Sequence, residues 1–111
     1  MPNLTSDEIR AYATGAGFRG DDLNIAVAVA LAESSGDPGA VGDEALTIGG
    51  SIGLWQINLR WHPEYAAASL VDPQTNANAA FAIYVEAGHS FIPWSTYKSG
   101  AYLEHLDTQP S

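Results

Sequence analysis

The spacing of polar and apolar positions predicts that the chain begins with a helix. The run TSDE at positions 5–8 has the pattern of a capping box, in which Thr5 accepts from a free backbone N–H and Glu8 reaches back to the cap. Glycines at positions 15 and 17 predict where this helix ends. The run GAGFRG at positions 15–20 also spells the fingerprint of dinucleotide-binding domains. That fingerprint follows a strand, so we interpret the run as a turn between helices and expect no cofactor.

The most apolar stretch of the chain, residues 23–33, predicts a buried helix. Either Asp21 or Asp22 would cap it, and the run LNIAVAVALA that follows is apolar nearly all round. Its β-branched residues would also suit a strand, but the alanines and the capping aspartates favour a helix. The breakers at positions 34–39 end it. The stretch is shorter than the roughly 20 residues that cross a bilayer, so we expect no membrane span.

The rest of the chain predicts shorter elements. Residues 40–52 are rich in glycine and include a β-favouring run at 46–48, which indicates a small β-hairpin or an irregular loop. We expect short helices over residues 54–57, from Pro63 through residue 68 and around residues 99–106, and a longer one from Asp72 to a stop at Gly88. The sequence therefore predicts a mostly α, α+β fold, a small multi-helix domain with a minor hairpin or loop region near residues 40–52.

Composition and charge narrow the class of partner. A chain of 111 residues with 46% hydrophobic and 15% charged residues is typical of one globular domain, so we expect residues 1–111 to form a single domain. The chain has no cysteine and therefore no disulfide. A formal net charge of −9 repels phosphate backbones and anionic membrane surfaces. We therefore expect no nucleic acid and no membrane among its partners.

Glu33 is the candidate for acid–base chemistry, because it ends the most hydrophobic helix of the chain. Burial beside that helix and the negative end of the helix dipole both disfavour the anion, so we expect the pKa of Glu33 to be raised. A carboxyl group that stays protonated near neutral pH is what general-acid cleavage of a glycosidic bond requires. The helix alone leaves open the alternative of a solvated glutamate at a helix end.

Four short blocks follow one another between Glu33 and Gly100. They are ESS at 33–35, GLWQI at 53–57, DPQTNA at 72–77 and TYKSG at 96–100. In this order they resemble the Glu-Ser pair, the Gly-Leu-Met-Gln motif, the asparagine-containing helix start and the Ala-Tyr-Asn-Ala-Gly turn of the soluble lytic transglycosylases. That family is close to the goose-type lysozymes within the lysozyme-like superfamily. Trp55 replaces the methionine of the second motif, and Lys98 replaces the asparagine of the last.

The resemblance implies a lysozyme-like fold and a muramidase that cleaves the β-1,4 bond between N-acetylmuramic acid and N-acetylglucosamine. Glu33 would be the catalytic acid and then the base. We expect substrate-binding side chains at Ser34, Ser51, Gln56, Asn76 and Tyr97, and Tyr97 could instead position Glu33.

The course of the reaction stays open at this point. A lytic transglycosylase needs a single catalytic glutamate and leaves a 1,6-anhydro product. A hydrolytic lysozyme would use a second carboxylate, for which Asp43, Glu44 and Asp37 are the candidates on the glycine-rich loop. A lysozyme-like module that binds glycan without cutting it is an alternative of another class.

Aromatic and histidine side chains add little to this assignment. The tryptophans at positions 55, 61 and 94 could stack on sugar rings, but aromatic residues in a small domain mostly belong to the core, so we expect at most one to do so. The histidines at positions 62, 89 and 105 lack the spacing of metal ligands, so we expect no metal.

We expect the partner to be the glycan strands of peptidoglycan in the bacterial cell wall, and the protein to be a monomer. The acidic charge gives no attraction to an anionic wall, which favours an attached cell-wall-binding domain in a longer chain. The first residues lack a basic patch followed by an apolar run, so no secretory signal is predicted. A bacteriophage endolysin or virion-associated lysin, one domain of a larger protein, or a secreted enzyme without its signal would each fit.

Overall fold

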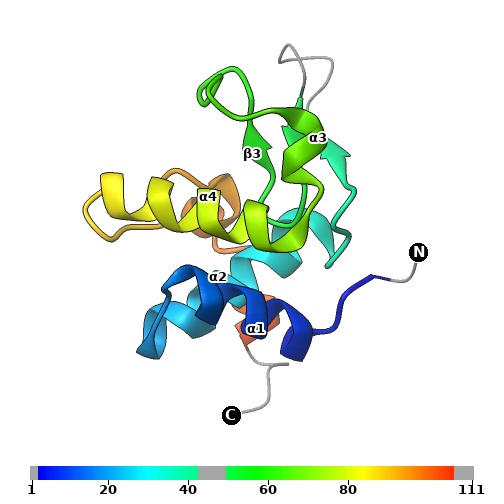
Figure 1. Cartoon of the computed structure of the whole chain (residues 1–111). Helices are drawn as coiled ribbons and strands as arrows, with labels where there is room; N and C mark the ends of the chain where they lie inside the picture. Colours follow the sequence, from blue (N-terminus) through cyan, green and yellow to red (C-terminus); the bar gives the residue numbers. More distant parts are fainter. Residues whose placement is uncertain (1–2, 43–49, 107–111) are drawn as a thin grey trace.

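A computed structural model gives the fold and describes residues 3–42 and 50–106 (Figure 1). The helices of this part are α1 (Ser6–Ala16), α2 (Gly20–Ser34), α3 (Ala67–Leu70), α4 (Pro73–Glu86), α5 (Ser95–Ser99) and α6 (Leu103–Leu106). The strands are β1 (Val41–Gly42), β2 (Ser51–Ile52) and β3 (Ile57–Asn58). In Figure 1 the three long helices α1, α2 and α4 lie together, while the strands and α3 gather at one end of the molecule.

The prediction of a mostly α, α+β domain with a β-hairpin near residues 40–52 is confirmed. β1 and β2 pair antiparallel, with Val41 opposite Ile52, and β3 adds a third antiparallel strand, with Ile57 opposite Ile52. The β-favouring run at residues 46–48 lies outside the described residues.

The capping box at the start of α1 is confirmed. Thr5 Oγ1 accepts from the backbone N–H of Glu8 at 3.2 Å, and Glu8 Oε1 accepts from that of Thr5 at 2.9 Å. The helix ends at Gly17, whose φ of +129° suits glycine. A Cβ there would lie 2.8 Å from the Phe81 ring, so only glycine lets α4 come this close. The chain turns from α1 to α2 at residues 17–19, within the glycine-rich run, so the predicted helix-to-helix turn is confirmed.

The start of α2 differs from the prediction. Neither Asp21 nor Asp22 is the cap, because the helix already begins at Gly20 and both aspartates lie in its first turn. Acidic side chains there stabilise the positive end of the helix dipole. Asp22 also accepts a hydrogen bond from the Tyr84 hydroxyl on α4. Burial, and then this carboxylate, raise the pKa of Tyr84 to about 12.

Three of the predicted shorter helices are corrected. Residues 53–56 form a turn between β2 and β3 instead of a helix, because Gly53 and Gln56 adopt left-handed φ values of +79° and +48°. The predicted helix at Pro63 begins only at residue 67, as α3. The last helix is two short ones, α5 and α6, separated by Gly100 with a φ of +86°. The start of α4 is as predicted, with the Asp72 side chain accepting from the backbone N–H of Thr75 at 2.9 Å.

Trp55 lies at the centre of the core and joins three parts of the fold. Its indole Nε1 donates to the carbonyl of Ala26 in α2 at 2.9 Å, and its backbone N–H donates to Asn76 Oδ1 in α4 at 2.9 Å. Its carbonyl accepts from the indole of Trp94, just before α5, at 2.8 Å. The side chain is fully buried, so all three hydrogen bonds are shielded from water.

Asn76 holds the turn between β2 and β3 against α4. Its Nδ2 donates to the carbonyls of Ile52 at 2.8 Å and Leu70 at 2.9 Å. The approach is so close that a Cβ on Gly53 would lie 2.1 Å from Asn76 Nδ2. Glycine at position 53 is therefore required, both for this contact and for its positive φ.

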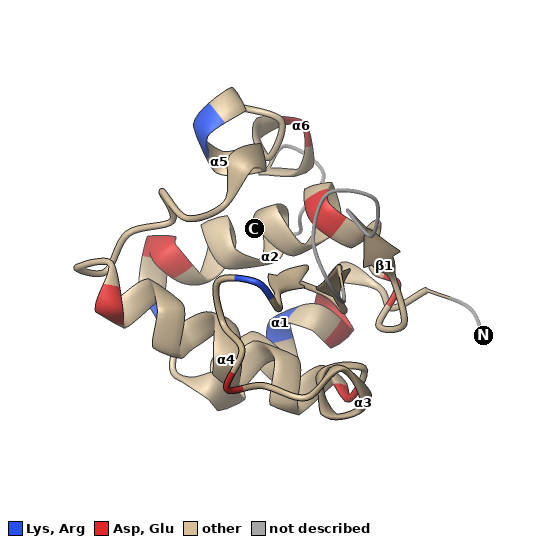
Figure 2. Cartoon of the chain, turned by 90° about the horizontal axis from the view of Figure 1, so that it is seen from above, with Lys and Arg blue, Asp and Glu red and all other residues tan. Residues whose placement is uncertain are grey.

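The few lysines and arginines lie apart from one another in the fold, and aspartates and glutamates are more numerous (Figure 2). Arg10 Nη1 donates to Asn24 Oδ1 at 2.7 Å and thereby joins α1 to α2. Arg19 Nη1 donates to the carbonyls of Thr14 and Phe18, at 2.9 and 2.8 Å. Among the helices in the described part of the chain, none is long and apolar enough to cross a membrane.

Candidate functional site

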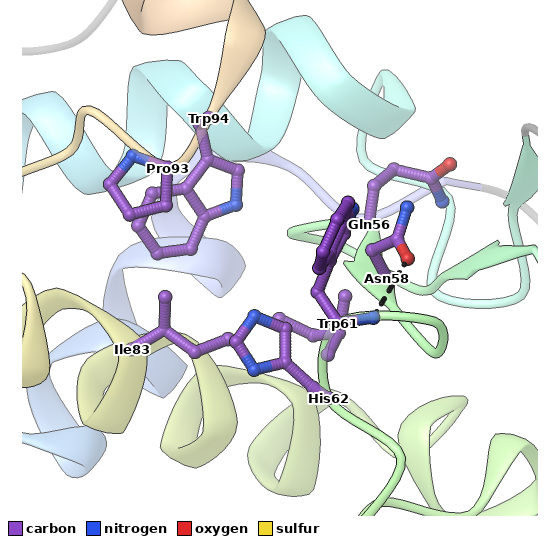
Figure 3. Close-up of a pocket in the computed structure, with 8 residues that line it drawn as sticks. Gln56, Asn58, Trp61, His62, Ile83, Pro93 and Trp94 are labelled. Atoms are coloured by element: carbon purple, nitrogen blue, oxygen red, sulfur yellow. Dashed lines mark hydrogen bonds between the residues drawn. The ribbon is translucent and has the colours of Figure 1, made fainter. Parts of the chain in front are cut away.

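A groove lies where the turn around β3 faces the segment that leads into α5. It has two adjoining compartments, with volumes of about 220 and 240 Å³. Both are lined by Gln56, Asn58, Trp61, Pro93 and Trp94. Figure 3 shows Pro93 and Trp94 across an open space from the other three side chains.

The two compartments differ in their remaining walls. The Glu33 compartment, of about 220 Å³, is completed by Glu33, Ser51 and Ser95. The His62 compartment, of about 240 Å³, is completed by Ile57, His62 and Ile83. The first is thus the more polar end of the groove, and the second is the more apolar one.

Glu33 comes from the last turn of α2, after a run of fully buried residues at 26–30. Its side chain is half-buried and lines the groove. Its Oε2 accepts from Thr96 Oγ1 of α5 at 2.9 Å. The carboxyl group is therefore held by a neighbouring helix while it borders open space.

Ser51 and Asn58 lie on paired strands in the Glu33 compartment. They are direct partners in the register of β2 and β3, and Asn58 Nδ2 donates to Ser51 Oγ at 3.4 Å. A hydroxyl and an amide thus lie next to each other at the groove wall. Ser51 was predicted as a groove residue, whereas Asn58 was missed. The signal was available, because Asn58 directly follows the block GLWQI.

Gln56 shapes the wall that both compartments share. Its Nε2 donates to the carbonyls of Ala40 and Gly53, each at 3.0 Å, so its amide group ties the β1 end of the hairpin to the turn. Because both hydrogen bonds come from Nε2, the side chain has one orientation beside the groove.

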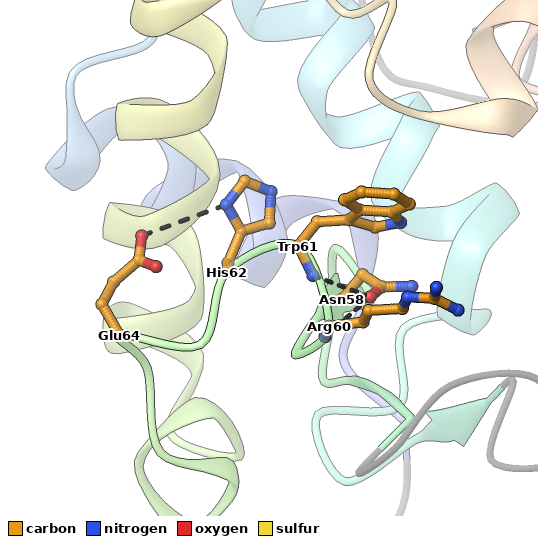
Figure 4. A network of polar contacts seen from close by, with 5 residues as sticks. All are labelled: Asn58, Arg60, Trp61, His62 and Glu64. Carbon is orange, nitrogen blue, oxygen red and sulfur yellow. Dashed lines mark hydrogen bonds and ion pairs between the residues drawn. The ribbon is translucent and has the colours of Figure 1, made fainter.

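Trp61 presents an open indole to the groove, with 71% of its surface exposed. Asn58 Oδ1 accepts from the backbone N–H groups of Arg60 at 2.9 Å and Trp61 at 3.3 Å, which holds this turn (Figure 4). The Arg60 guanidinium lies 5.5 Å from the centre of the indole ring. Trp55 and Trp94 are 0% and 5% exposed, so Trp61 offers a ligand far more indole surface than either of them.

The His62 compartment combines apolar walls with an imidazole. Ile57 and Ile83 are buried side chains that form part of its surface. His62 Nδ1 lies 4.0 Å from Glu64 Oε2 (Figure 4). The compartment can therefore accept a group with an apolar face and a polar edge.

Two of the predicted substrate-binding residues have a different role. Asn76 is fully buried, and its amide is engaged with backbone groups, so it supports the turn and cannot touch a ligand in the groove. Ser34 is 8% exposed; its Oγ donates to the carbonyl of Ala30 at 2.9 Å and accepts from the N–H of Gly36 at 3.2 Å. Ser34 thereby stabilises the end of α2 beneath Glu33.

Tyr97 and Asp37 are not among the side chains that line the two compartments of the groove. The Tyr97 ring packs between Phe91 and Tyr102, with centroids 5.8 and 4.9 Å away. Asp37 Oδ1 accepts from the N–H of Gly39 at 2.9 Å, within the turn that follows α2. The other two candidates for a second carboxylate, Asp43 and Glu44, lie outside the described residues.

A comparison with protein families relates the chain to a known domain family. A family model described as a lysozyme-like domain matches residues 10–96. All the residues that line either compartment of the groove, Glu33 among them, lie within this match. Neither the comparison with curated proteins nor the comparison with solved structures finds a match.

Proposed function

The chain belongs to the lysozyme-like domain family, and we propose that it cleaves peptidoglycan between N-acetylmuramic acid and N-acetylglucosamine. Membership in this family indicates glycosidic bond cleavage in peptidoglycan in general. The observation that carries the proposal is the position of Glu33, a carboxyl group at the end of an apolar helix that borders an open groove.

In the proposed reaction Glu33 is first the acid. Its protonated carboxyl donates a proton to the glycosidic oxygen as the bond between that oxygen and C1 of the muramyl ring breaks. The shortened strand leaves with a new hydroxyl group, and Glu33 becomes a carboxylate. The neutral hydrogen-bonding side chains Ser51 and Asn58 would bind hydroxyl or acetamido groups of the sugar beside it.

For the second half of the reaction we propose the transglycosylase course. The Glu33 carboxylate takes the proton from the C6 hydroxyl of the same muramyl residue, and the C6 oxygen bonds to C1 to close a 1,6-anhydro ring. The resemblance of the blocks ESS at 33–35 and GLWQI at 53–57 to the motifs of the soluble lytic transglycosylases supports a route with a single acidic residue. In that route the acetamido group of the sugar stabilises the positive charge.

Trp61 supports a carbohydrate as the ligand of the groove. Most of the Trp61 indole is exposed to water, which is unfavourable for an apolar ring. The flat apolar face of a pyranose ring could stack on it and bury this surface. Because Trp61 lines both compartments, a sugar stacked on it would belong to the same glycan strand as the scissile bond beside Glu33.

We propose the bacterial cell wall as the place of action, with the glycan strand as the partner. The chain carries a net charge of −9, so long-range electrostatic attraction does not bring it to an anionic wall. We therefore propose that a wall-binding module elsewhere in a longer chain, or delivery by a phage particle, brings the domain to its substrate.

The test is the chemistry of the products. Purified protein is incubated with insoluble peptidoglycan, and the soluble muropeptides are identified by mass spectrometry. We expect fragments that end in 1,6-anhydro-N-acetylmuramic acid. Fragments with reducing ends would contradict the transglycosylase course and identify a hydrolytic lysozyme. Co-sedimentation with peptidoglycan without soluble fragments would contradict cleavage altogether and indicate a glycan-binding module.

A further inference from the structure

Thr96 and Glu33 are 63 positions apart in the chain and meet at the groove through one hydrogen bond of 2.9 Å. We propose that Thr96 is a positioning residue, whose hydroxyl donates to Glu33 Oε2 and thereby holds the carboxyl group in one orientation at the wall of the groove. This inference rests on the proposed function of Glu33, but it concerns a residue to which that function assigns no role.

Thr96 is held in place by the core. Trp94, which precedes α5, donates to the carbonyl of Trp55, and Trp55 donates to the carbonyl of Ala26 in α2. Two buried indoles thus fix α5 relative to the helix that carries Glu33. The carbonyl of Thr96 also accepts from the N–H of Tyr102 at 3.2 Å. As a β-branched residue, Thr96 has few side-chain rotamers, so the direction of its hydroxyl is well defined.

The hydrogen bond from Thr96 acts differently on the protonated and on the anionic state of Glu33. In a protonated carboxyl one oxygen bears the proton and the other is a carbonyl acceptor. The Thr96 hydroxyl can donate to such an acceptor while Glu33 is protonated. When Glu33 has given up the proton, the same contact becomes a charge-assisted hydrogen bond and is stronger. Thr96 therefore holds one orientation through both halves of the reaction and favours the anionic state of the second half.

The contact belongs to this chain and not to the motif it resembles. The turn Ala-Tyr-Asn-Ala-Gly has alanine where this chain has Thr96, and alanine has no hydroxyl to donate. A hydroxyl at this position adds a hydrogen bond that the resemblance does not imply.

Other ionisable groups lie on the elements that pack against α2. In the described part of the chain they are Asp7, Glu8, Arg10 and Tyr12 on α1, Tyr84 and Glu86 on α4, Tyr97 and Lys98 on α5, and Glu104 and His105 on α6. None of them changes in a substitution at position 96, so a matched pair of Thr96 variants isolates the effect of the hydroxyl.

The test compares Thr96→Val, which keeps the shape and removes the hydroxyl, with Thr96→Ser, which keeps the hydroxyl. We expect Thr96→Val to lower kcat about tenfold with little change in KM, since the missing interaction acts on the acid and not on substrate binding. We also expect the basic limb of its pH–activity profile to move to higher pH, because the anion of Glu33 has lost a donor. Thr96→Ser should restore both. An unchanged kcat and pH profile in Thr96→Val, or a loss that Thr96→Ser does not restore, would overturn the proposal.

A second readout does not depend on activity. The carboxyl carbon of Glu33 is followed by NMR during a pH titration, with Glu33→Gln used to assign its signal. We expect the midpoint to be higher in Thr96→Val than in the wild type and in Thr96→Ser. Equal midpoints would overturn the role of Thr96. If the wild type cleaves no peptidoglycan but the midpoint is still higher in Thr96→Val, the proposed function is refuted while the role of the Thr96 hydrogen bond stands.

Discussion

The indole N–H of Trp94 donates to the backbone carbonyl of Trp55 at 2.8 Å, which connects the wall of the groove to the centre of the core. Trp55 in turn donates to Ala26 in the helix that ends at Glu33. The wall and the acid are therefore parts of one packed unit. Such a connection keeps a catalytic group in place before the substrate arrives, which is more effective than ordering it during the reaction.

Trp94→Phe tests this connection. The ring would still pack near Phe91, whose centroid lies 5.9 Å away, but the carbonyl of Trp55 would lose its donor in the core. We expect the free energy of unfolding to fall by about 1–3 kcal/mol in urea denaturation, the usual cost of a buried polar group left without its partner. Trp61→Phe is the control and should change stability little, because Trp61 is mostly exposed. Equal effects of the two substitutions would argue against the connection.

Asn76→Ala should be among the most destabilising substitutions of a polar residue. It removes one acceptor and two donor contacts of a fully buried amide, leaving the N–H of Trp55 and two carbonyls unpaired. We expect a loss of about 3 kcal/mol or more, measured by urea denaturation. Asn78→Ala, at an exposed position of the same helix, is the matched control and should lose far less. A loss below about 1 kcal/mol for Asn76→Ala would contradict its structural role.

Tyr84 should make stability fall at alkaline pH. Its pKa rises from 10.0 to about 12 in the folded protein, because of burial and then of Asp22. The folded state holds the phenol proton more firmly, so this contribution is fully present below about pH 10 and is lost as pH rises towards 12. We expect the difference in stability between the wild type and Tyr84→Phe to be constant below about pH 9 and to shrink between pH 10 and 12. A difference that does not vary across this range would contradict the burial of the phenol.

Trp61→Ala should weaken glycan binding without changing the fold. The indole lines both compartments and is 71% exposed, so its removal should disturb the core little. We expect the affinity for a chito-oligosaccharide to fall about tenfold, in the range of a lost aromatic contact, while thermal stability stays the same. Binding is followed by tryptophan fluorescence and by calorimetry in the Glu33→Gln background. Unaltered affinity would exclude Trp61 as a sugar contact.

The elements with local signals were predictable from the sequence. The capping box at Thr5 and the start of α4 at Asp72 each depend on residues within one turn of the helix. The turn at residues 53–56 was not predictable, because Gly53 and Gln56 take left-handed conformations that are held by Asn76, far along the chain. A helix was expected there because the run Leu54 to Ile57 is apolar, and apolar runs do not reveal the backbone conformation.

The site was predictable in part. The helix end at Glu33 and the block containing Gln56 pointed to residues that the structure brings to one groove. Burial could not be deduced from the motifs, so Asn76 was expected in contact with substrate although it lies in the core. The contact between Thr96 and Glu33 crosses 63 positions and depends on the packing of α5 against α2, which no local pattern shows.

The most direct test of the central claim is the turnover of purified peptidoglycan by Glu33→Gln. Glutamine keeps the size of the side chain and can still accept from Thr96, but it has no acidic proton to give to the glycosidic oxygen. We expect the variant to fold as the wild type does and to release no soluble muropeptides above background. Release at the wild-type rate would contradict Glu33 as the catalytic acid.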